Sequence, residues 1–402
     1  MITRILVVGG GASGMAAAIS AASARPDADV TLLEALPRCG KKLLATGNGR
    51  CNLINLNTSP ESYHSGGAFA SFALGAFDPA RFFEFLGIDT VFDGEGRGYP
   101  ATFQASSVLD ALRLAINETG VKLMCDCPVK DISPRKTGWA VSCAGGEFFA
   151  DRVIFAGGGL AGKGLGENAS FRILEKLGHH IAPPLPGLTH FVCDKKQVAG
   201  LKGIRLKGRF TLLSGGVPVQ SEEGEAIFRD DGISGIAIMQ LSLGAKQRLA
   251  GGEKLALRLC PGGGMAPDAL RARLKRFPSR ALADVFTGEL NRFVAQNAIK
   301  RAGLKPDTRA GGLSDSGILR LHAALDAWDI PILDTGGFAD AQVMEGGLAT
   351  CDFDPETLES KLCPGLYACG EALDVAGYCG GHNLHWAWAS GTLAGREAAK
   401  AP

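Results

Sequence analysis

The chain begins with a short apolar run that predicts a buried strand of a parallel sheet. Residues 2–8 are rich in leucine and β-branched side chains, as strands covered on both faces usually are. A glycine-rich turn follows, and small residues over 13–24 then predict a helix packed closely on the sheet. A second apolar run at 30–33 ends at Glu34. The start of the chain therefore predicts a strand–helix–strand unit.

The next part of the chain alternates loops, helices and short strands. Residues 36–60 are rich in Gly, Asn, Lys and Arg and predict a loop around a short helix. Helices are predicted at 78–87, 105–120 and 171–177. Short apolar runs predict strands at 121–125, 129–132, 139–143, 148–149 and 152–156. This part therefore continues the α/β pattern of the first residues.

The character of the pattern changes at the proline-rich residues 183–186. Residues 188–265 offer short strands and turns, whereas apolar positions over 266–329 recur at helical spacing. From residue 330 the glycine-rich strand–turn–helix pattern returns and lasts to the end. We therefore expect an α/β protein whose dinucleotide-binding domain is discontinuous, made of 1–187 and 330–402. A β unit and a small helical unit would be inserted between its two parts.

The composition is that of a globular protein and argues against a nucleic-acid-binding or membrane-spanning one. The 402 residues carry 42 Lys and Arg against 41 Asp and Glu, a net charge of +1, so we expect no nucleic-acid partner. Apolar residues make up 46%, enough for a globular core. No window approaches the uninterrupted apolar length of a membrane helix, so we expect no membrane span. The first residues lack the pattern of a signal peptide, and we expect a cytoplasmic protein.

Neither the spacing of the cysteines nor the pair of adjacent histidines indicates a metal or catalytic site. The 11 cysteines are spread along the chain without a CxxC pair. Cys125 and Cys127 are separated by one residue and have no partner pair, so we expect no metal site. We interpret the cysteines as reduced thiols. The histidines at 179 and 180 follow a predicted helix and precede prolines, and we expect both to be solvated.

The first motif with a chemical meaning is Gly9-x-Gly11-x-x-Gly14, directly between the first predicted strand and helix. Gly9 would allow a tight turn, Gly11 would let the backbone approach a pyrophosphate, and Gly14 would let helix and strand pack closely. N–H groups at the helix start hold negative phosphates. Glu34 stands 20 residues after Gly14, where a carboxylate accepts hydrogen bonds from a ribose. Together these residues predict a site for FAD or NAD.

Two further glycine segments suit the same cofactor. The loop at 47–52, preceded by Lys42, suits a backbone that lies along phosphates and ribitol. The alternative is a surface loop with solvated basic side chains. The predicted strand at 152–156 runs into Gly157, which suits a second close pass of the backbone by the cofactor. The alternative there is a simple turn.

The C-terminal segment favours a flavin over a nicotinamide. A predicted strand ends at Gly370, and the acids Glu371 and Asp374 follow, where either one would reach ribitol hydroxyls. Residues 380–383 then precede an apolar stretch at helical spacing over 384–398. A helix N-terminus aimed at the pyrimidine edge of a flavin would stabilise the negative charge of the reduced ring. The alternative is an ordinary terminal core helix.

Taken together, these segments resemble the BaiN/RdsA family of NAD(P)/FAD-dependent oxidoreductases, also called YhiN-type or aminoacetone-oxidase-like flavoproteins. The matching segments cover nearly the whole chain: Val7–Gly14, Gly40–Asn52, Phe155–Gly159, Gly224–Ser242, Gln342–Gly347 and Glu359–Gly391. The resemblance implies a glutathione-reductase-like Rossmann FAD domain, interrupted by a β-barrel-like domain and a small helical domain. It also implies FAD contacts at Gly9, Gly11, Ser13, Gly14, Glu34, Lys42, Asn52, Val129, Gly157, Gly370, Glu371, Gly381 and Asn383.

The chain departs from the family pattern at three positions that could border the flavin. Asn48 stands where the family usually has Gly, Cys379 where it has Thr, and His382 where it has Tyr. Cys379 is a candidate reactive thiol, since a helix N-terminus lowers a thiol pKa; alternatively it is a small residue filling space. His382 is a candidate proton donor or substrate anchor; alternatively it is a hydrogen-bonded wall residue.

We therefore expect an FAD-dependent oxidoreductase that reduces a C=C or C=O bond of a small organic substrate, driven by NAD(P)H. No second strand–GxGxxG–helix unit exists in the sequence, so NAD(P)H would dock transiently at the flavin. One alternative is an amine or amino-ketone oxidase that uses oxygen, and another is a non-catalytic flavin-binding redox sensor. A nicotinamide dehydrogenase without flavin is disfavoured by the C-terminal glycine segments.

Overall fold

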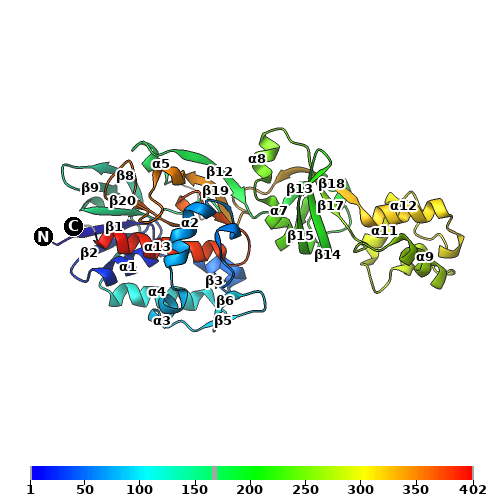
Figure 1. Ribbon diagram of the computed structural model, residues 1–402, viewed down its shortest axis with the longest axis horizontal. Coiled ribbons are helices and arrows are strands. Elements are labelled where there is room, and N and C mark those ends of the chain that lie inside the picture. Colours follow the sequence, from blue (N-terminus) through cyan, green and yellow to red (C-terminus); the bar gives the residue numbers. More distant parts are fainter. Residues whose placement is uncertain (1, 165–169, 401–402) are drawn as a thin grey trace. The chain divides into compact units, whose positions relative to one another are not determined.

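The computed structural model describes residues 2–164 and 170–400 (Figure 1). The chain divides into two compact units. One unit contains Met1–Gly187 together with Ala341–Pro402, and the other contains Leu188–Asp340. The first unit is therefore discontinuous in sequence and is built from both ends of the chain. The limit expected at residues 329 and 330 differs from this division, because the barrel strand β18 (Trp328–Thr335) crosses it and the second unit extends to Asp340. The limit expected at residue 265 stays a prediction.

The first unit is centred on a five-stranded parallel sheet. Its strand order is β20 (Leu366–Ala368), β11 (Arg152–Phe155), β1 (Arg4–Val8), β2 (Asp29–Leu33) and β7 (Lys122–Met124). In the register of this sheet, Val8 lies beside Leu33 on one side and Phe155 on the other. The carboxyl ends of β1, β2 and β11 therefore meet at one edge, where ligands bind in open α/β sheets.

Two helices from opposite ends of the chain pack against each other beside this sheet (Figure 1). They are α1 (Ala12–Ala24) and α13 (His382–Lys400). Their contact is close because glycine lines it: a Cβ built on Gly391 would overlap the carbonyl oxygen of Ser13. A larger residue would have to push the helices apart. The first turn of α1 is thus fixed by the C-terminal helix.

Shorter elements surround the sheet of the first unit. The helices are α2 (Gly67–Ala76), α3 (Pro79–Phe85), α4 (Ala105–Glu118), α5 (Arg172–Glu175) and the 3₁₀ turns η1 (Leu43–Gly49), η2 (Pro60–Ser62), η4 (Thr350–Asp352) and η5 (Gly370–Ala372). The small antiparallel groups are β3 (Ile54–Asn55) with β6 (Arg97–Pro100) and β5 (Thr90–Phe92), β4 (Tyr63–Ser65) with β21 (Ala376–Gly377), and β12 (Ile181–Gly187) with β19 (Val343–Leu348). Helix α2 was not predicted: it is short, and glycine, a weak helix former, stands near both of its ends.

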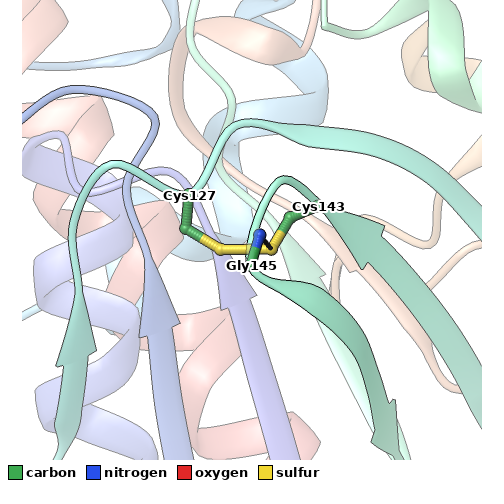
Figure 2. The surroundings of a disulfide bond; sticks show 3 residues. All are labelled: Cys127, Cys143 and Gly145. Atoms are coloured by element: carbon green, nitrogen blue, oxygen red, sulfur yellow. Dashed lines mark hydrogen bonds between the residues drawn. A yellow bond between two sulfur atoms is a disulfide. The ribbon is translucent and has the colours of Figure 1, made fainter.

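A disulfide bond between Cys127, just before β8 (Val129–Pro134), and Cys143 lies at the end of a further antiparallel group (Figure 2). The group consists of β8, β9 (Trp139–Cys143) and β10 (Gly146–Ala150). Val129 pairs with Cys143 across the ladder, which brings the Cα atoms of the two cysteines to 5.7 Å. The expectation that all cysteines are reduced thiols is therefore wrong for this pair, because strand pairing joins residues that are separate in sequence.

The paired histidines occupy two different environments. His179 is buried, its ring is stacked on Phe353, and its Nε2 lies 2.8 Å from Ser360 Oγ. The neighbouring His180 exposes 77% of its side chain and contacts Asp352. The expectation that both are solvated is wrong for His179, because its ring is packed against Phe353 and hydrogen-bonded to Ser360.

The second unit contains a closed six-stranded barrel and a helical segment. The barrel order is β13 (Phe191–Cys193), β16 (Gly232–Ser234), β15 (Val217–Phe228), β14 (Arg205–Ser214), β17 (Leu255–Leu259) and β18 (Trp328–Thr335). Beside these strands are α6 (Lys195–Val198), α7 (Ile236–Ser242) and α8 (Ala245–Ala250). The barrel core holds large apolar side chains, among them Phe191, Phe210, Phe228 and Trp328.

The helical segment has a hydrophobic core of its own. It contains α9 (Pro267–Arg276), α10 (Leu282–Val285), α11 (Arg292–Arg301), η3 (Ala310–Gly312) and α12 (Asp315–Asp326). Leu270, Phe286, Ile299 and Leu321 are among its buried residues. The α/β fold class with an inserted barrel and a helical segment is confirmed. Across residues 2–164 and 170–400, none of the helices combines the length and the apolar character needed to cross a membrane.

Candidate functional site

The turn between β1 and α1 is shaped by three glycines with different tasks. Gly9 has a φ of +105°, and a Cβ there would overlap the carbonyl oxygen of Ala156. A Cβ on Gly14 would overlap the carbonyl oxygen of Gly9. A Cβ on Gly11, by contrast, would meet nothing within 4 Å. Packing therefore requires glycine at 9 and 14, while Gly11 leaves open space in front of the helix.

The first turn of α1 presents backbone donors to this space. Met15 is the first residue whose N–H bonds within the helix, to the carbonyl of Gly11 at 3.0 Å. No side chain caps this helix end, and the N–H groups of Ala12 and Ser13 have no acceptor in the described parts of the chain. Such a helix end suits a pyrophosphate, because its free N–H groups and the helix dipole both favour negative charge.

Glu34 lies directly beside this turn, at the end of β2. Its Oε2 accepts a hydrogen bond from the Gly10 N–H at 2.7 Å, and its Oε1 accepts one from the Leu36 N–H at 2.8 Å. The Glu34 carbonyl also accepts from the Cys127 N–H at 2.9 Å, which places the start of β8, with Val129, alongside. A carboxylate has about four acceptor positions, so Glu34 keeps capacity for ribose hydroxyls.

A second polar cluster brings Lys42 and Glu371 together. Lys42 Nζ lies 2.5 Å from the Gly159 carbonyl oxygen and 3.4 Å from Glu371 Oε2. Glu371 also accepts hydrogen bonds from the N–H groups of Gly159, at 3.2 Å, and Met344, at 2.8 Å. Its carboxylate therefore ties together η5, β19 and the segment after β11. Both side chains are partly exposed, at 34% and 26%, so a ligand can still reach them.

Asp374 is placed differently from Glu371. Its Oδ1 accepts from the Ser65 hydroxyl at 3.0 Å and from the Gly346 N–H at 3.1 Å. The carboxylate therefore joins β4 to β19. Its role in the fold is to hold these strands, and a direct contact with ribitol stays a prediction.

Gly370 connects the C-terminal segment to α1. Its N–H donates to Ser390 Oγ at 3.0 Å, and its carbonyl accepts from Trp386 Nε1 at 3.1 Å. A Cβ at this position, where φ is +69°, would overlap the Ser13 hydroxyl. Gly157 is equally constrained, since its Cβ would overlap the Ser170 hydroxyl. Gly370 and Gly157 therefore lie where the backbone is too close to a serine side chain to leave room for a larger residue.

The loop between β21 and α13 contains two of the predicted cofactor residues. Asn383 forms two hydrogen bonds to the backbone of Gly377, both at 2.8 Å, and so closes the loop. A Cβ on Gly381, where φ is +99°, would lie 2.6 Å from Asn52 Oδ1. This Asn52 oxygen is buried and has no hydrogen-bond partner in the described residues. A buried acceptor without a donor is costly, and a bound ligand with an N–H group would satisfy it.

The loop that carries Asn52 explains one departure from the family pattern. Asn48 and Cys51 both adopt left-handed backbone conformations, with φ of 56° and 59°. Asn tolerates this region better than most residues, so it can stand where the family usually has glycine. Burial raises the pKa of the Cys51 thiol to about 11. Cys51 is therefore a protonated structural thiol at neutral pH.

His382 begins α13 and is almost completely buried. Its Nδ1 lies 2.9 Å from the Thr58 hydroxyl, and its carbonyl accepts from the Tyr63 hydroxyl at 2.9 Å. Burial lowers the pKa of His382 to about 4, so the imidazole is neutral at pH 7. This environment is that of a hydrogen-bonded wall residue. Cys379 lies in the same loop and is half-buried, and a catalytic role for either residue stays a prediction.

A histidine–carboxylate pair close to this loop was not predicted. His64 Nε2 lies 3.4 Å from Glu345 Oε2, and the His64 ring is 6.4 Å from the ring of Tyr378. The two residues come from β4 and β19, which are far apart in sequence. Only the match of residues 342–347 to the family pattern could have drawn attention to Glu345.

Comparison with known proteins identifies the family. Residues 3–397 match the family model described as the HI0933-like protein Rossmann domain. The chain belongs to the HI0933-like family. A relative named 3-dehydro-bile acid delta(4,6)-reductase, from Clostridium scindens, is 36% identical over the full length of both proteins. A ribosomal RNA dihydrouridine synthase from Escherichia coli is 27% identical over 96% of this chain and 95% of the relative.

Solved structures agree with the HI0933-like fold. The 3-ketosteroid-delta4-(5alpha)-dehydrogenase of Rhodococcus jostii RHA1 superposes with a TM-score of 0.51 at 17% identity, covering 99% of this chain and 97% of that enzyme. The expected family, the fold class and the class of flavin-dependent oxidoreductase are thereby confirmed. The individual cofactor residues stay predictions. The expectation of no nucleic-acid partner also stays a prediction, since one relative is named for ribosomal RNA.

Proposed function

We propose that this HI0933-like protein binds FAD in its first unit and uses NAD(P)H to saturate a carbon–carbon double bond conjugated to a carbonyl. The observation that carries the proposal is the arrangement around α1. The open space at Gly11, the carboxylate of Glu34 and the start of α13 all belong to one unit. This arrangement fits a dinucleotide that runs from the adenosine side at β2 toward α13.

The residues present fit FAD in kind and in placement. The first turn of α1, with Gly11 and Ser13, would hold the pyrophosphate. Glu34 would accept the adenosine ribose hydroxyls, and the backbone at Val129 would meet the adenine. Lys42 and Glu371 would bind ribitol, with Gly157 and Gly370 allowing close passage, and Asn52 Oδ1 would accept from the flavin ring beside Gly381. When bound, FAD supplies the hydride chemistry; the protein binds and orients the reactants.

The substrate class is inferred from the relatives. The Clostridium scindens relative is named for reduction of a bile acid at its delta(4,6) bonds, and the Escherichia coli relative for formation of dihydrouridine. Both names describe the saturation of a carbon–carbon double bond. Because the first relative is the more similar of the two over the full chain, we propose a small ring-shaped enone as the substrate.

A second candidate substrate is RNA. Within α9–α12, Pro267–Asp326, the sequence has 11 Lys and Arg against 6 Asp and Glu, although the whole chain is nearly neutral. A local excess of basic residues favours phosphate contacts. Dihydrouridine formation on ribosomal RNA would then be the same reduction performed on a different substrate.

The proposal is tested by anaerobic mixing of the purified protein with NADH or NADPH. We expect the visible flavin band to bleach with one nucleotide and to return when a conjugated ketosteroid is added. Return of the band with RNA only would favour the second candidate. Bleaching by an amine, with hydrogen peroxide formed in air, would show an oxidase instead. Absence of bleaching with every donor would favour the non-catalytic sensor and overturn the proposal.

A further inference from the structure

A partly exposed histidine is backed by a buried carboxylate near the loop that we assign to the flavin ring. His64 Nε2 lies 3.4 Å from Glu345 Oε2. The His64 side chain is 33% exposed, whereas that of Glu345 is 11% exposed. A buried carboxylate fixes the orientation of an imidazole that it contacts. This arrangement is typical of a group that moves protons.

His64 lies on β4, which pairs with β21, the strand that precedes α13 in the chain. In this pairing, Tyr63 lies beside Gly377 and Ser65 beside Ala376. Tyr378 directly follows β21, and its ring lies 6.4 Å from that of His64. Four residues after Tyr378, helix α13 begins. His64 is therefore close to the loop that we assign to the flavin ring.

The strand that carries Glu345 is attached to the proposed ribitol residues. The N–H of Met344 donates to Glu371 at 2.8 Å, and the N–H of Gly346 donates to Asp374 at 3.1 Å. Glu345 stands between these two anchor points on β19. The His64–Glu345 pair is thus fixed from both strands to the polypeptide that surrounds the cofactor site.

The other polar groups near this loop are less suited to protonate a substrate. Burial lowers the pKa values of His382 and His385 to about 4, so both are neutral bases at pH 7. Cys379 is half-buried in the loop. The pair of His180 and Asp352 has the same chemistry but lies at the other end of β12 and β19, beyond the pairing of Ile181 with Leu348.

We propose that His64 is the proton donor of the reduction and that Glu345 is the residue that positions it. This inference rests on the proposed function. A hydride, supplied by NAD(P)H by way of FAD, adds to the carbon β to the carbonyl. The electron pair of the double bond moves toward the carbonyl, and the protonated imidazole of His64 gives a proton to the α carbon. The products are the saturated ketone and NAD(P)⁺, and one proton taken up from the solvent restores the protonated His64.

The experiment compares His64→Gln and Glu345→Gln with wild type on two substrates. An enone needs both a hydride and a proton, whereas a nitroalkene gives a stable nitronate after the hydride alone. We expect H64Q to retain FAD and to be reduced by NAD(P)H at the wild-type rate. Its reoxidation by the enone should slow at least about 100-fold, as loss of a general acid does, while reoxidation by the nitroalkene should change little. E345Q should show the same selective loss to a smaller extent.

His180→Gln is the matched control, because it removes a similar histidine–carboxylate contact elsewhere in the unit. It should behave as wild type with both substrates. An H64Q protein that reduces the enone at the wild-type rate would overturn the inference, and so would an equal loss with both substrates or a loss of FAD, since either shows a structural role. If wild type itself were reduced by NAD(P)H but reoxidised by no enone, the proposed function would fail instead.

Discussion

The carboxylate of Glu34 is fixed to the dinucleotide turn by a hydrogen bond of 2.7 Å from the backbone N–H of Gly10. Replacing Glu34 by Arg removes this acceptor and places a cation where a ribose is expected. A hydrogen bond to a charged group contributes about 1.5–3 kcal/mol, so we expect FAD affinity to fall roughly 10- to 100-fold. The FAD content of purified protein and a titration of the apoprotein with FAD both measure the effect.

The control for this variant is Glu61→Arg, which makes the same charge change at an exposed glutamate of the same unit. E61R should retain FAD as wild type does. Equal FAD occupancy in the E34R and wild-type proteins would show that Glu34 does not contact the cofactor.

Gly11 and Gly14 should respond to alanine in opposite ways. A Cβ on Gly14 would overlap the Gly9 carbonyl, whereas one on Gly11 would meet no neighbouring atom within 4 Å. Gly11 also has φ −79° and ψ −171°, a conformation that alanine adopts without strain. We expect G14A to lose about 1–3 kcal/mol of unfolding free energy through overpacking. G11A should unfold like wild type but bind FAD weakly, because its methyl group enters the phosphate space.

Denaturant unfolding and FAD titration of both variants separate the two effects. A G11A protein with normal FAD affinity would mean that the pyrophosphate does not approach this turn. A G14A protein with normal stability would mean that α1 can shift away from β1 without cost.

The arrangement of a site could be predicted from the sequence where the residues that determine it are close together along the chain. Gly9, Gly11 and Gly14 lie within one turn, and the distance to Glu34 is set by one helix and one strand, so their arrangement follows from local structure. The Cys127–Cys143 and His64–Glu345 contacts instead depend on which strands pair. Nothing local to His64 indicates that β4 joins β21 or that β19 passes nearby.

The stability of the first unit should fall as the pH drops below neutrality. Burial lowers the pKa of His382 to about 4, whereas the ordinary value in an unfolded chain is about 6.5. Below pH ~6.5 His382 binds a proton in the unfolded state but not in the folded state. The free energy of unfolding therefore falls until about pH 4 and then stays level. For His382 alone this loss is about 2 kcal/mol at pH 5, since one pKa unit is worth about 1.4 kcal/mol.

Urea unfolding at pH 7.5, 6 and 5 measures this dependence. The His382→Gln variant cannot bind the proton in either state, so its stability should fall less steeply with pH than that of wild type. Parallel curves for the two proteins would show that His382 is not buried as a neutral base. His385 has the same direction of shift and accounts for part of the slope that remains.

The disulfide between Cys127 and Cys143 makes a direct prediction about thiol content (Figure 2). Without reduction, the denatured protein should show nine free thiols to a thiol reagent. After reduction, all 11 cysteines should react. The bond closes a loop of 16 residues, and closing a loop of this length stabilises a fold by about 3 kcal/mol. Cys143→Ser should therefore lower the unfolding free energy by about this amount.

The same bond lies next to the proposed adenosine site, because the Cys127 N–H donates to the carbonyl of Glu34 at 2.9 Å. Loss of the cross-link should loosen the start of β8 and weaken FAD binding along with stability. Cys363→Ser is the matched control, since Cys363 is a free thiol of the same unit, and it should leave thermal stability and FAD affinity as in wild type. A thiol count of 11 without reduction would contradict the cross-link, and the C143S protein should then match wild type in both measurements.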